Sequence, residues 1–205
     1  MTDNAIVYVV DDDAAFRDSL VWLIEANNHR VEAFASAEAF LAACHPGMAG
    51  CLVVDMRMPG LSGLELHDRL RDDGIELPTI VITGHGDVPM AVSAFRKGVV
   101  DFVEKPLDDG YMLARIDTCL AQDAENRGRR ANAESIARRL ATLTAREREV
   151  LDCVVAGKLN KQIADTLAIS IKTVEVHRSR VMEKMQVTTV AELVKISLAD
   201  GAIRR

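Results

Sequence analysis

The chain has 205 residues, 49% of them hydrophobic and 27% charged, which is typical of folded globular proteins and excludes disordered and collagen-like classes. At this length two domains are expected, and no apolar stretch reaches the roughly 18 residues of a membrane span. Residues 1–122 carry 20 acidic and 9 basic side chains, whereas residues 123–205 carry 11 and 16, so their net charges are −11 and +5. An acidic first part suits a cation site or a soluble surface, and a basic second part suits a polyanion, with chance surface charge as the alternative.

The first part alternates short apolar runs with amphipathic segments. The continuous β-branched runs predict strands buried on both faces, at Ile6–Val10, Val31–Phe34, Cys51–Val54, Thr79–Thr83 and Val99–Val103. The segments between them predict helices near 14–27, 36–44, 63–72 and 87–97, with a fifth after the N-cap Asp108. Five such units predict an α/β domain over residues 1–122, with a parallel sheet between two layers of helices.

Residues 123–142 are polar and rich in Ala, Arg and Glu, which predicts a partly helical linker. Gly128 is the only obvious helix breaker in this segment. Ile136, Leu140 and Leu143 are spaced as one helical stripe, which packs either on its own domain or on a second copy of the chain.

Residues 143–205 show no strand pattern and predict an all-α domain of four helices. Thr144 with Glu147 and Thr189 with Glu192 are capping boxes, which open the first and the last of these helices. The two helices between them are the informative part of this domain.

The segment Asn160–Ser170 predicts a short helix, a tight turn and Ser170 as the N-cap of the next helix, which is expected from about Ile171 to Lys184. Apolar residues hold the pair together, and small Ala164 permits a close crossing. This pattern predicts a helix-turn-helix, because the second helix presents short and basic side chains that suit phosphates and major-groove base edges. The alternative is an ordinary helical hairpin with a solvated charged face.

Polar side chains follow four of the five predicted strands of the first domain. They are Asp11, Asp12 and Asp13 after the first strand, Asp55 at the end of the third, Thr83 at the end of the fourth and Lys105 after the fifth. They converge because the carboxyl ends of parallel strands meet at one edge of a sheet. Converging carboxylates repel one another, and a hard divalent cation with oxygen ligands, such as Mg²⁺, relieves that repulsion. With Lys105 neutralising phosphoryl oxygens, Asp55 is then available as a nucleophile.

These residues resemble the receiver domain of two-component response regulators over residues 1 to about 122. The resemblance rests on four segments in order, Val9–Asp13, Val54–Gly60, Ile82–Gly86 and Glu104–Pro106. It implies a flavodoxin-like fold with strand order 2-1-3-4-5, a cis bond between Lys105 and Pro106, and phosphorylation by a sensor histidine kinase. It also implies that Asp55 is the phosphoacceptor and that Mg²⁺ is bound by Asp11, Asp12, Asp55 and the backbone carbonyl of Arg57. Thr83 and Lys105 would bind the phosphoryl oxygens, and Phe102 would be the aromatic switch. Arg57 and His85 would influence the rate of hydrolysis.

The second domain resembles the LuxR-type DNA-binding domain across residues 143–205, through Leu143–Leu151, Asn160–Ala164 and Lys172–His177. Joined to a receiver, it is similar to the FixJ/NarL class of response regulators, and the segments 84–89 and 174–178 favour FixJ-like members. The resemblance implies base contacts from Glu175, Val176 and Ser179 with Arg178 adjacent, and backbone contacts from Lys161, Lys172, Thr173 and His177. It places the dimerisation face on the last helix, including Val190, Leu193 and Val194.

Together these features predict a cytoplasmic transcription factor, an activator rather than an enzyme, that dimerises on phosphorylation and binds an inverted repeat in double-stranded DNA. RNA polymerase is an expected partner, and the four scattered cysteines are expected to be reduced. An aspartyl phosphatase would need an acid where Arg57 stands, and a phosphate-independent module would better suit a pocket without Asp55, Thr83 or Lys105. Whether the resting receiver masks the DNA-binding helices or merely fails to dimerise stays open.

Overall fold

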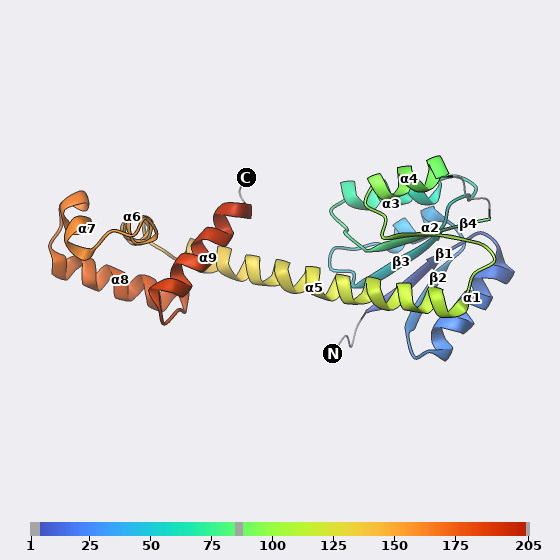
Figure 1. Ribbon diagram of the computed structural model, residues 1–205, viewed down its shortest axis with the longest axis horizontal. Helices are drawn as coiled ribbons and strands as arrows, with labels where there is room; N and C mark the ends of the chain where they lie inside the picture. The colour runs from blue at the N-terminus through green and yellow to red at the C-terminus, as the bar shows by residue number, and fades with distance from the viewer. Residues whose placement is uncertain (1–4, 85–87, 204–205) are drawn as a thin grey trace. The chain divides into compact units, whose positions relative to one another are not determined.

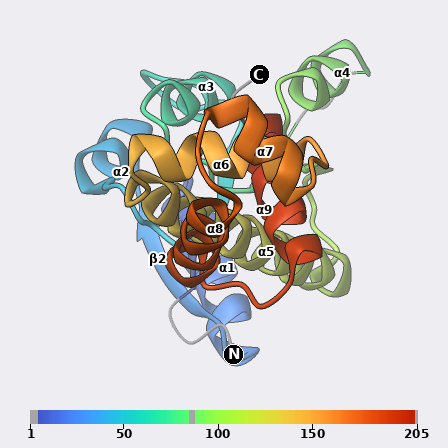
Figure 2. The same ribbon diagram turned by 90° about the vertical axis from the view of Figure 1, so that its left-hand side faces the viewer.

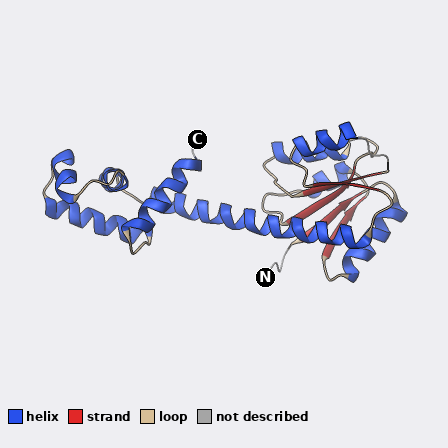
Figure 3. Ribbon diagram, viewed as in Figure 1, coloured by secondary structure: helices blue, strands red, loops and turns tan. Residues whose placement is uncertain are grey.

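The computed structural model describes residues 5–84 and 88–203. They belong to two compact units, Met1–Arg127 and Gly128–Arg205. The strands lie in the first unit, and the regular elements described in the second are helices (Figure 3). None of the helices in the described ranges has both the length and the apolar composition that crossing a bilayer requires.

The first unit is built on a five-stranded parallel sheet in the order β2-β1-β3-β4-β5, which confirms the α/β fold and the strand order that the resemblance implies. The strands are β1 Ile6–Val10, β2 Arg30–Phe34, β3 Gly50–Asp55, β4 Thr79–Thr83 and β5 Asp101–Glu104. The three central strands are almost completely buried, as expected of parallel strands covered on both faces.

The helices of the first unit form two layers, one on each face of the sheet (Figure 1). Helices α1 Ala14–Ala26 and α5 Asp109–Ala141 cover one face, where Ile24 and Ile116 are fully buried. Helices α2 Ala37–Ala43, α3 Gly63–Asp72 and α4 Val88–Arg96 cover the other, with Phe40 and Leu66 in its core. The apolar stripes of the helices therefore close two cores and leave the ends of the strands accessible for chemistry.

The outer strands differ from the sequence expectation. The segment Val31–Phe34 was predicted to be buried on both faces, but Glu32 and Ala33 are exposed in β2, which begins one residue earlier at Arg30. The cause is position, because β2 lies at the edge of the sheet, as the implied strand order places it, and an edge strand has a neighbour on one side only. The charged Glu32 also interrupts the apolar run. The last strand begins at Asp101 rather than at the predicted Val99, which is buried in the core just before the strand begins.

Helix α5 continues through the segment predicted to be a partly helical linker. It runs without a break from Asp109 to Ala141, so Gly128 does not end it. Glycine costs about 1 kcal/mol relative to alanine inside a helix but keeps its backbone N–H, so the hydrogen-bond ladder survives. Ile136 and Leu140 are each 6% exposed and pack in the core of the second unit. The stripe on this helix therefore packs on its own domain.

The described part of the second unit, up to residue 203, adds four helices, α6 Ala145–Val155, α7 Asn160–Leu167, α8 Ile171–Met185 and α9 Val190–Ile203 (Figure 2). Both predicted capping boxes are present, at Thr144 with Glu147 and at Thr189 with Glu192. Ser170 caps α8 by accepting from Thr173 N at 3.0 Å, and Ala168 in the left-handed region (φ 52°) makes the turn from α7. These elements confirm the predicted helix-turn-helix architecture.

Candidate functional site

Two carboxylates and one ammonium meet at the carboxyl edge of the sheet. Asp11 follows β1 and Asp55 ends the adjacent strand β3, and the two residues are 2% and 7% exposed. Lys105, which follows β5, places its Nζ 2.8 Å from Asp11 Oδ2 and 2.7 Å from Asp55 Oδ1. The predicted convergence therefore occurs, with the lysine bridging the two acids.

Burial and charge act on these groups in opposite directions. Burial raises the pKa of Asp11 above its ordinary value, although hydrogen bonds from Lys105 and from Asp13 N oppose the shift. For Lys105, burial is the largest single effect and would lower the pKa, but hydrogen bonds and charges from Asp11 and Asp55 together raise it. The ammonium is therefore held in its charged form between the two acids.

The loop after β3 constrains the Asp55 carboxylate and backbone. Asp55 Oδ2 accepts a hydrogen bond from Arg57 N at 2.6 Å. Gly63, the first residue of α3, approaches so closely that a Cβ there would lie 2.5 Å from Asp55 O. Any larger residue at position 63 would push α3 away from the strand end, so glycine permits the compact loop that orients Asp55.

The predicted switch residues lie on the neighbouring strands. Thr83 ends β4 and is 1% exposed, and its carbonyl accepts from Lys105 N at 2.8 Å. Phe102 lies on β5 opposite Val81 and is half-buried against the core under α4. The bond between Lys105 and Pro106 is cis, as the resemblance implies. His85 lies outside the described residues.

The side chains of Asp12 and Arg57 are exposed, unlike those of Asp11 and Asp55. Within residues 5–84 and 88–203, no group of three or more His, Cys, Asp or Glu side chains is arranged to hold a metal ion. The groups that could bind a metal are carboxylate oxygens, which are hard ligands. Two of the carboxylates, those of Asp11 and Asp55, are buried and share the Lys105 ammonium. Their chemistry suits Mg²⁺, which prefers oxygen ligands and keeps several waters.

Two side chains on the first helix reach the site and were not predicted. Arg17 Nη1 donates to Asp11 O at 2.7 Å, and Lys105 Nζ lies 3.8 Å from the centroid of the Phe16 ring. Asp13 caps α1 by accepting from Ala15 N and Phe16 N. The Asp13 cap could have predicted these contacts, because it fixes the start of α1 directly after the site loop. Residues at the start of that helix then lie beside the loop.

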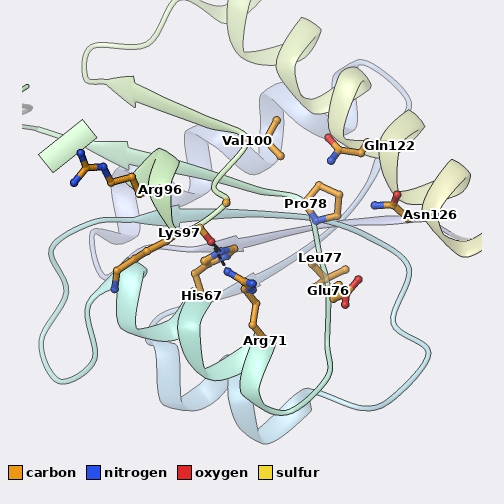
Figure 4. A pocket seen from close by; sticks show the side chains of 11 residues that line it. His67, Arg71, Glu76, Leu77, Pro78, Arg96, Lys97, Val100, Gln122 and Asn126 are labelled. Carbon is orange, nitrogen blue, oxygen red and sulfur yellow. Dashed lines mark hydrogen bonds between the residues drawn. The ribbon is translucent and has the colours of Figure 1, made fainter. Parts of the chain in front are cut away.

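A separate hollow of about 470 Å³ lies near the opposite ends of β4 and β5 (Figure 4). There His67 Nδ1 lies 3.1 Å from Thr79 Oγ1 and Nε2 lies 3.1 Å from Lys97 O, to which Arg71 Nη1 also donates at 2.7 Å. Burial lowers the pKa of His67 and so favours the neutral ring. These contacts connect α3 to β4 and to the turn after α4, away from the carboxylate site.

In the second unit, four residues of α8 form one exposed stripe at helical spacing, namely Lys172, Glu175, Val176 and Ser179. Val174, Val181 and Met185 lie on the buried side of the same helix, where they pack against the domain core. Lys161 is exposed on α7. The structure therefore brings the predicted base-facing residues onto one accessible face.

The other predicted DNA-contacting residues are less accessible. Thr173, His177 and Arg178 are half-buried. The Thr173 hydroxyl lies 2.8 Å from Ser170 Oγ within the helix cap. His177 Nδ1 is buried and has no hydrogen-bond partner among the described residues.

The predicted dimerisation face on α9 is exposed only in part. Val190 is 41% exposed and Val194 is half-buried. Leu193 corrects the prediction, because it is 2% exposed and packs in the core of its own unit with Val150 and Met185. On a short amphipathic helix the apolar spacing of a core face and of an interface is the same, so sequence spacing did not separate them.

Comparison with known families agrees with both units. Residues 7–117 match the response regulator receiver domain, and residues 141–197 match the luxR family of bacterial regulatory proteins. The chain is 47% identical over 202 residues to the transcriptional regulatory protein FixJ of Azorhizobium caulinodans, with 98% of this chain and 95% of the relative covered. It is 39% identical over 198 residues to the response regulator TodT of Pseudomonas putida F1, covering 96% and 87%.

Solved structures show the same similarity. The response regulator StyR matches with a TM-score of 0.87 at 40% identity, over 95% of this chain and 98% of that chain. Full-length FixJ from B. japonicum matches with a TM-score of 0.59 at 43% identity, over 97% and 98%. With a receiver domain, a LuxR-type DNA-binding domain and close identity over nearly the full length, this chain belongs to the FixJ-like response regulators, which are transcriptional regulators.

Proposed function

We propose that Asp55 accepts a phosphoryl group from a sensor histidine kinase, and that this phosphorylation activates a dimeric transcription factor. The observation that carries the proposal is the buried Asp55 carboxylate within 2.7 Å of Lys105 Nζ, beside a second acid. In this setting the carboxylate already contacts a cation, the Lys105 ammonium, that can neutralise the oxygens of the incoming phosphoryl group. Phosphoryl transfer requires such a cation.

In the transfer, an Asp55 oxygen forms the new bond to phosphorus, while the bond between phosphorus and the donor's histidine nitrogen breaks and leaves its electron pair on that nitrogen. The Lys105 ammonium neutralises the carboxylate before the transfer and, from the same position, the phosphoryl oxygens after it. Arg57 N, which donates to Asp55 Oδ2 at 2.6 Å, holds the carboxylate during the approach. Positioning and electrostatics account for most of the rate of such reactions.

Receiver domains in general bind Mg²⁺ at the phosphorylation site. Here Asp11, Asp12, Asp55 and the backbone carbonyl of Arg57 would hold it. When bound, the ion supplies positive charge that offsets the charge of the phosphoryl oxygens. Asp11 and Asp55 are preorganised for this role by burial and by the hydrogen bonds that already fix them.

Thr83 and Phe102 are proposed as the switch. Phosphorylation adds about two negative charges at Asp55, which the Thr83 hydroxyl would approach as a hydrogen-bond donor. Phe102 on the next strand is half-buried: it packs against the core and is also partly exposed, so a change of rotamer would change the surface of the domain there. The change of surface around Phe102 would then favour the dimer.

The exposed stripe on α8 is proposed as the DNA-reading surface. Glu175, Val176 and Ser179 would face bases with Arg178 adjacent, and Lys161, Lys172, Thr173 and His177 would contact the phosphate backbone. A dimer, with Val190 and Val194 at its α9 contact, would place two such helices about one helical turn apart on an inverted repeat. We propose an activator that works with RNA polymerase in the cytoplasm.

The test of the acceptor is mass measurement after incubation with Mg²⁺ and acetyl phosphate. Wild type should gain one phosphoryl group, and Asp55→Asn, which preserves side-chain shape, should gain none. Asp72→Asn, an exposed change on α3, is the matched control and should be labelled like wild type. Undiminished labelling of Asp55→Asn would sink the assignment.

The DNA surface is tested by selecting binding sites with the phosphorylated protein and by measuring affinity against salt. Log affinity should fall by about 0.9 per neutralised phosphate for each log unit of salt. Lys161→Ala and Lys172→Ala should weaken all sequences alike, whereas Glu175→Ala and Ser179→Ala should change which sequence is preferred. An unchanged preference in the last two variants would reject the proposed reading face.

Coupling between the two activities is tested by sedimentation and gel shift. Phosphorylation should raise both the dimer fraction and operator affinity, and stabilising a dimer by about 1.4 kcal/mol shifts its equilibrium tenfold. A fragment used for comparison should begin at Gly128, because Ile136 and Leu140 belong to the core of the second unit. We expect that fragment to bind DNA without phosphate, which would support masking by the receiver. If the fragment is inactive while the phosphorylated full-length chain binds, masking is rejected and receiver-driven dimerisation is the mechanism.

A further inference from the structure

The Lys105 ammonium has a third contact besides its two carboxylates. Its Nζ lies 3.8 Å from the centroid of the Phe16 ring, while it donates to Asp11 Oδ2 and Asp55 Oδ1 at 2.8 and 2.7 Å. An aromatic face attracts a cation within about 6 Å of its centroid, and more strongly where water is partly excluded. The Lys105 side chain is 22% exposed, so this contact is largely sheltered.

An open groove of about 610 Å³ adjoins this contact and is lined in part by Phe16, Trp22, Gly84, Lys105 and Pro106. A lysine side chain has many rotamers and a strongly hydrated head group, so an ammonium beside an open groove has solvent-facing alternatives to the acid pocket. The ring of Phe16 lines the groove and contacts the ammonium, and it therefore favours the rotamer in which Nζ stays between the acids.

We infer that Phe16 is a positioning residue for phosphorylation of Asp55, because its ring face holds the Lys105 ammonium in the acid pocket. This inference rests on the proposed function. As an Asp55 oxygen bonds to phosphorus, the bond from phosphorus to the donor's leaving atom breaks and its electron pair departs with the donor. The Lys105 ammonium must already be in place to neutralise the negative charge on the phosphoryl oxygens, since a misplaced ammonium would slow the transfer.

Phe16 also packs beside the core formed with α1, so an apolar role has to be separated from an electrostatic one. Fluorine on the ring withdraws electron density and weakens the negative face while it changes the ring's size little. Substitution by leucine removes the ring but keeps apolar bulk. Tyrosine keeps the aromatic face and serves as the conservative rescue.

The experiment measures phosphorylation of the full-length chain by phosphoramidate with Mg²⁺, since a small donor removes any effect of kinase docking. The variants carry Phe16→Leu, Phe16→Tyr or trifluorophenylalanine at position 16. We expect the leucine and trifluoro variants to react about three- to tenfold more slowly and the tyrosine variant to react like wild type. Trifluorophenylalanine at position 95, exposed on α4, is the matched control and should have no effect.

A second readout needs neither phosphate nor metal. The ring of Phe16 should shift the NMR signals of the Lys105 side-chain protons upfield, and Phe16→Leu should abolish that shift. Equal rates for wild type and the trifluoro variant overturn the inference, even if Phe16→Leu is slow, because the ring would then act by bulk alone. If wild type is not labelled at Asp55, the proposed function fails; an upfield shift of Lys105 that persists in Phe16→Leu overturns the Phe16 contact independently.

Discussion

The two units place their functional charges differently. In the first unit, Asp11, Asp55 and Lys105 lie together at the end of the sheet, where a ligand can reach them. In the second unit, the buried Glu147 carboxylate pairs with the partly exposed Lys184 at 2.6 Å, between α6 and α8. The candidate DNA-binding stripe of that unit is exposed instead.

The difference follows from what each partner requires. Phosphoryl transfer needs charges with little surrounding water, and parallel strands provide several chain ends at one sheet edge where such charges can be partly buried. DNA offers a regular array of phosphates, which exposed side chains on a helix can reach without prior burial. At the sheet edge of the first unit, buried charge therefore serves chemistry. Elsewhere it supports the fold, as with Asp101 and Asp123 in the first unit and Glu147 in the second.

The largest expected effects come from the two cores, and they test whether the units are separate. Leu52 lies in the first core and Ile163 in the second, and both are 0% exposed. Leu52→Ala and Ile163→Ala should each cost about 3 kcal/mol, since a cavity adds to the lost burial. Hydrogen exchange resolved by peptide should show faster exchange in residues 5–127 for the first variant and in residues 128–203 for the second. Equal loss of protection in both units would show that the chain unfolds as one body.

A smaller effect is expected from the buried pair in the second unit. Hydrogen bonds lower the pKa of Glu147 from its ordinary value near 4.5 to about 2. The hydrogen bond from Lys184 has the largest effect, and the one from Thr144 N has the next largest. A lowered carboxylate pKa adds stability above about pH 4.5 that is lost as pH falls towards 2. Glu147→Gln keeps the capping box but removes the charge, and should lower the free energy of unfolding by about 2 kcal/mol near neutral pH. The loss stays below that of a fully buried pair because Lys184 is one-third exposed.

The same variant should show a flatter stability profile between pH 4.5 and about 2, measured by chemical denaturation followed in the second unit. Glu149→Gln is the matched control, since Glu149 pairs with Arg146 at the surface and is 51% exposed. That control should change stability by under about 0.5 kcal/mol. If the two variants behave alike, the Glu147 pair does not hold the second unit together.

The smallest effects are expected from two equivalent helix caps, one in each unit. Ser36 accepts from Ala39 N at 3.1 Å to start α2, and Ser170 accepts from Thr173 N at 3.0 Å to start α8. Ser36→Ala and Ser170→Ala should each cost about 1 kcal/mol, and each only in its own unit. Thermal unfolding with peptide-level readout measures both. A Ser170→Ala variant with unaltered stability but altered DNA binding would assign that hydroxyl to DNA rather than to the cap.

Much of the first unit was predictable because its signals are local. The run from Ile6 to Val10 appears as β1 with those bounds, and the chain order of strands and helices follows the alternation of apolar and amphipathic segments. The approach of Asp11, Asp55 and Lys105 was predictable as well, since it follows from strand direction. The exposure of β2 was missed when its residues were taken alone, although the strand order implied by the resemblance already placed that strand at the edge of the sheet.

In the second unit the sequence by itself determined the helix caps, the helix-turn-helix and the exposed stripe on α8, because capping spacing and helical period are local properties. Only the tertiary structure decided which apolar side chains became core, as with Leu193, and which charges met across long separations, as with Glu147 and Lys184. It also decided that the Lys105 ammonium lies against the Phe16 ring. Such contacts depend on the packing of elements distant in the chain, and no local pattern of residues encodes which side chain will face which.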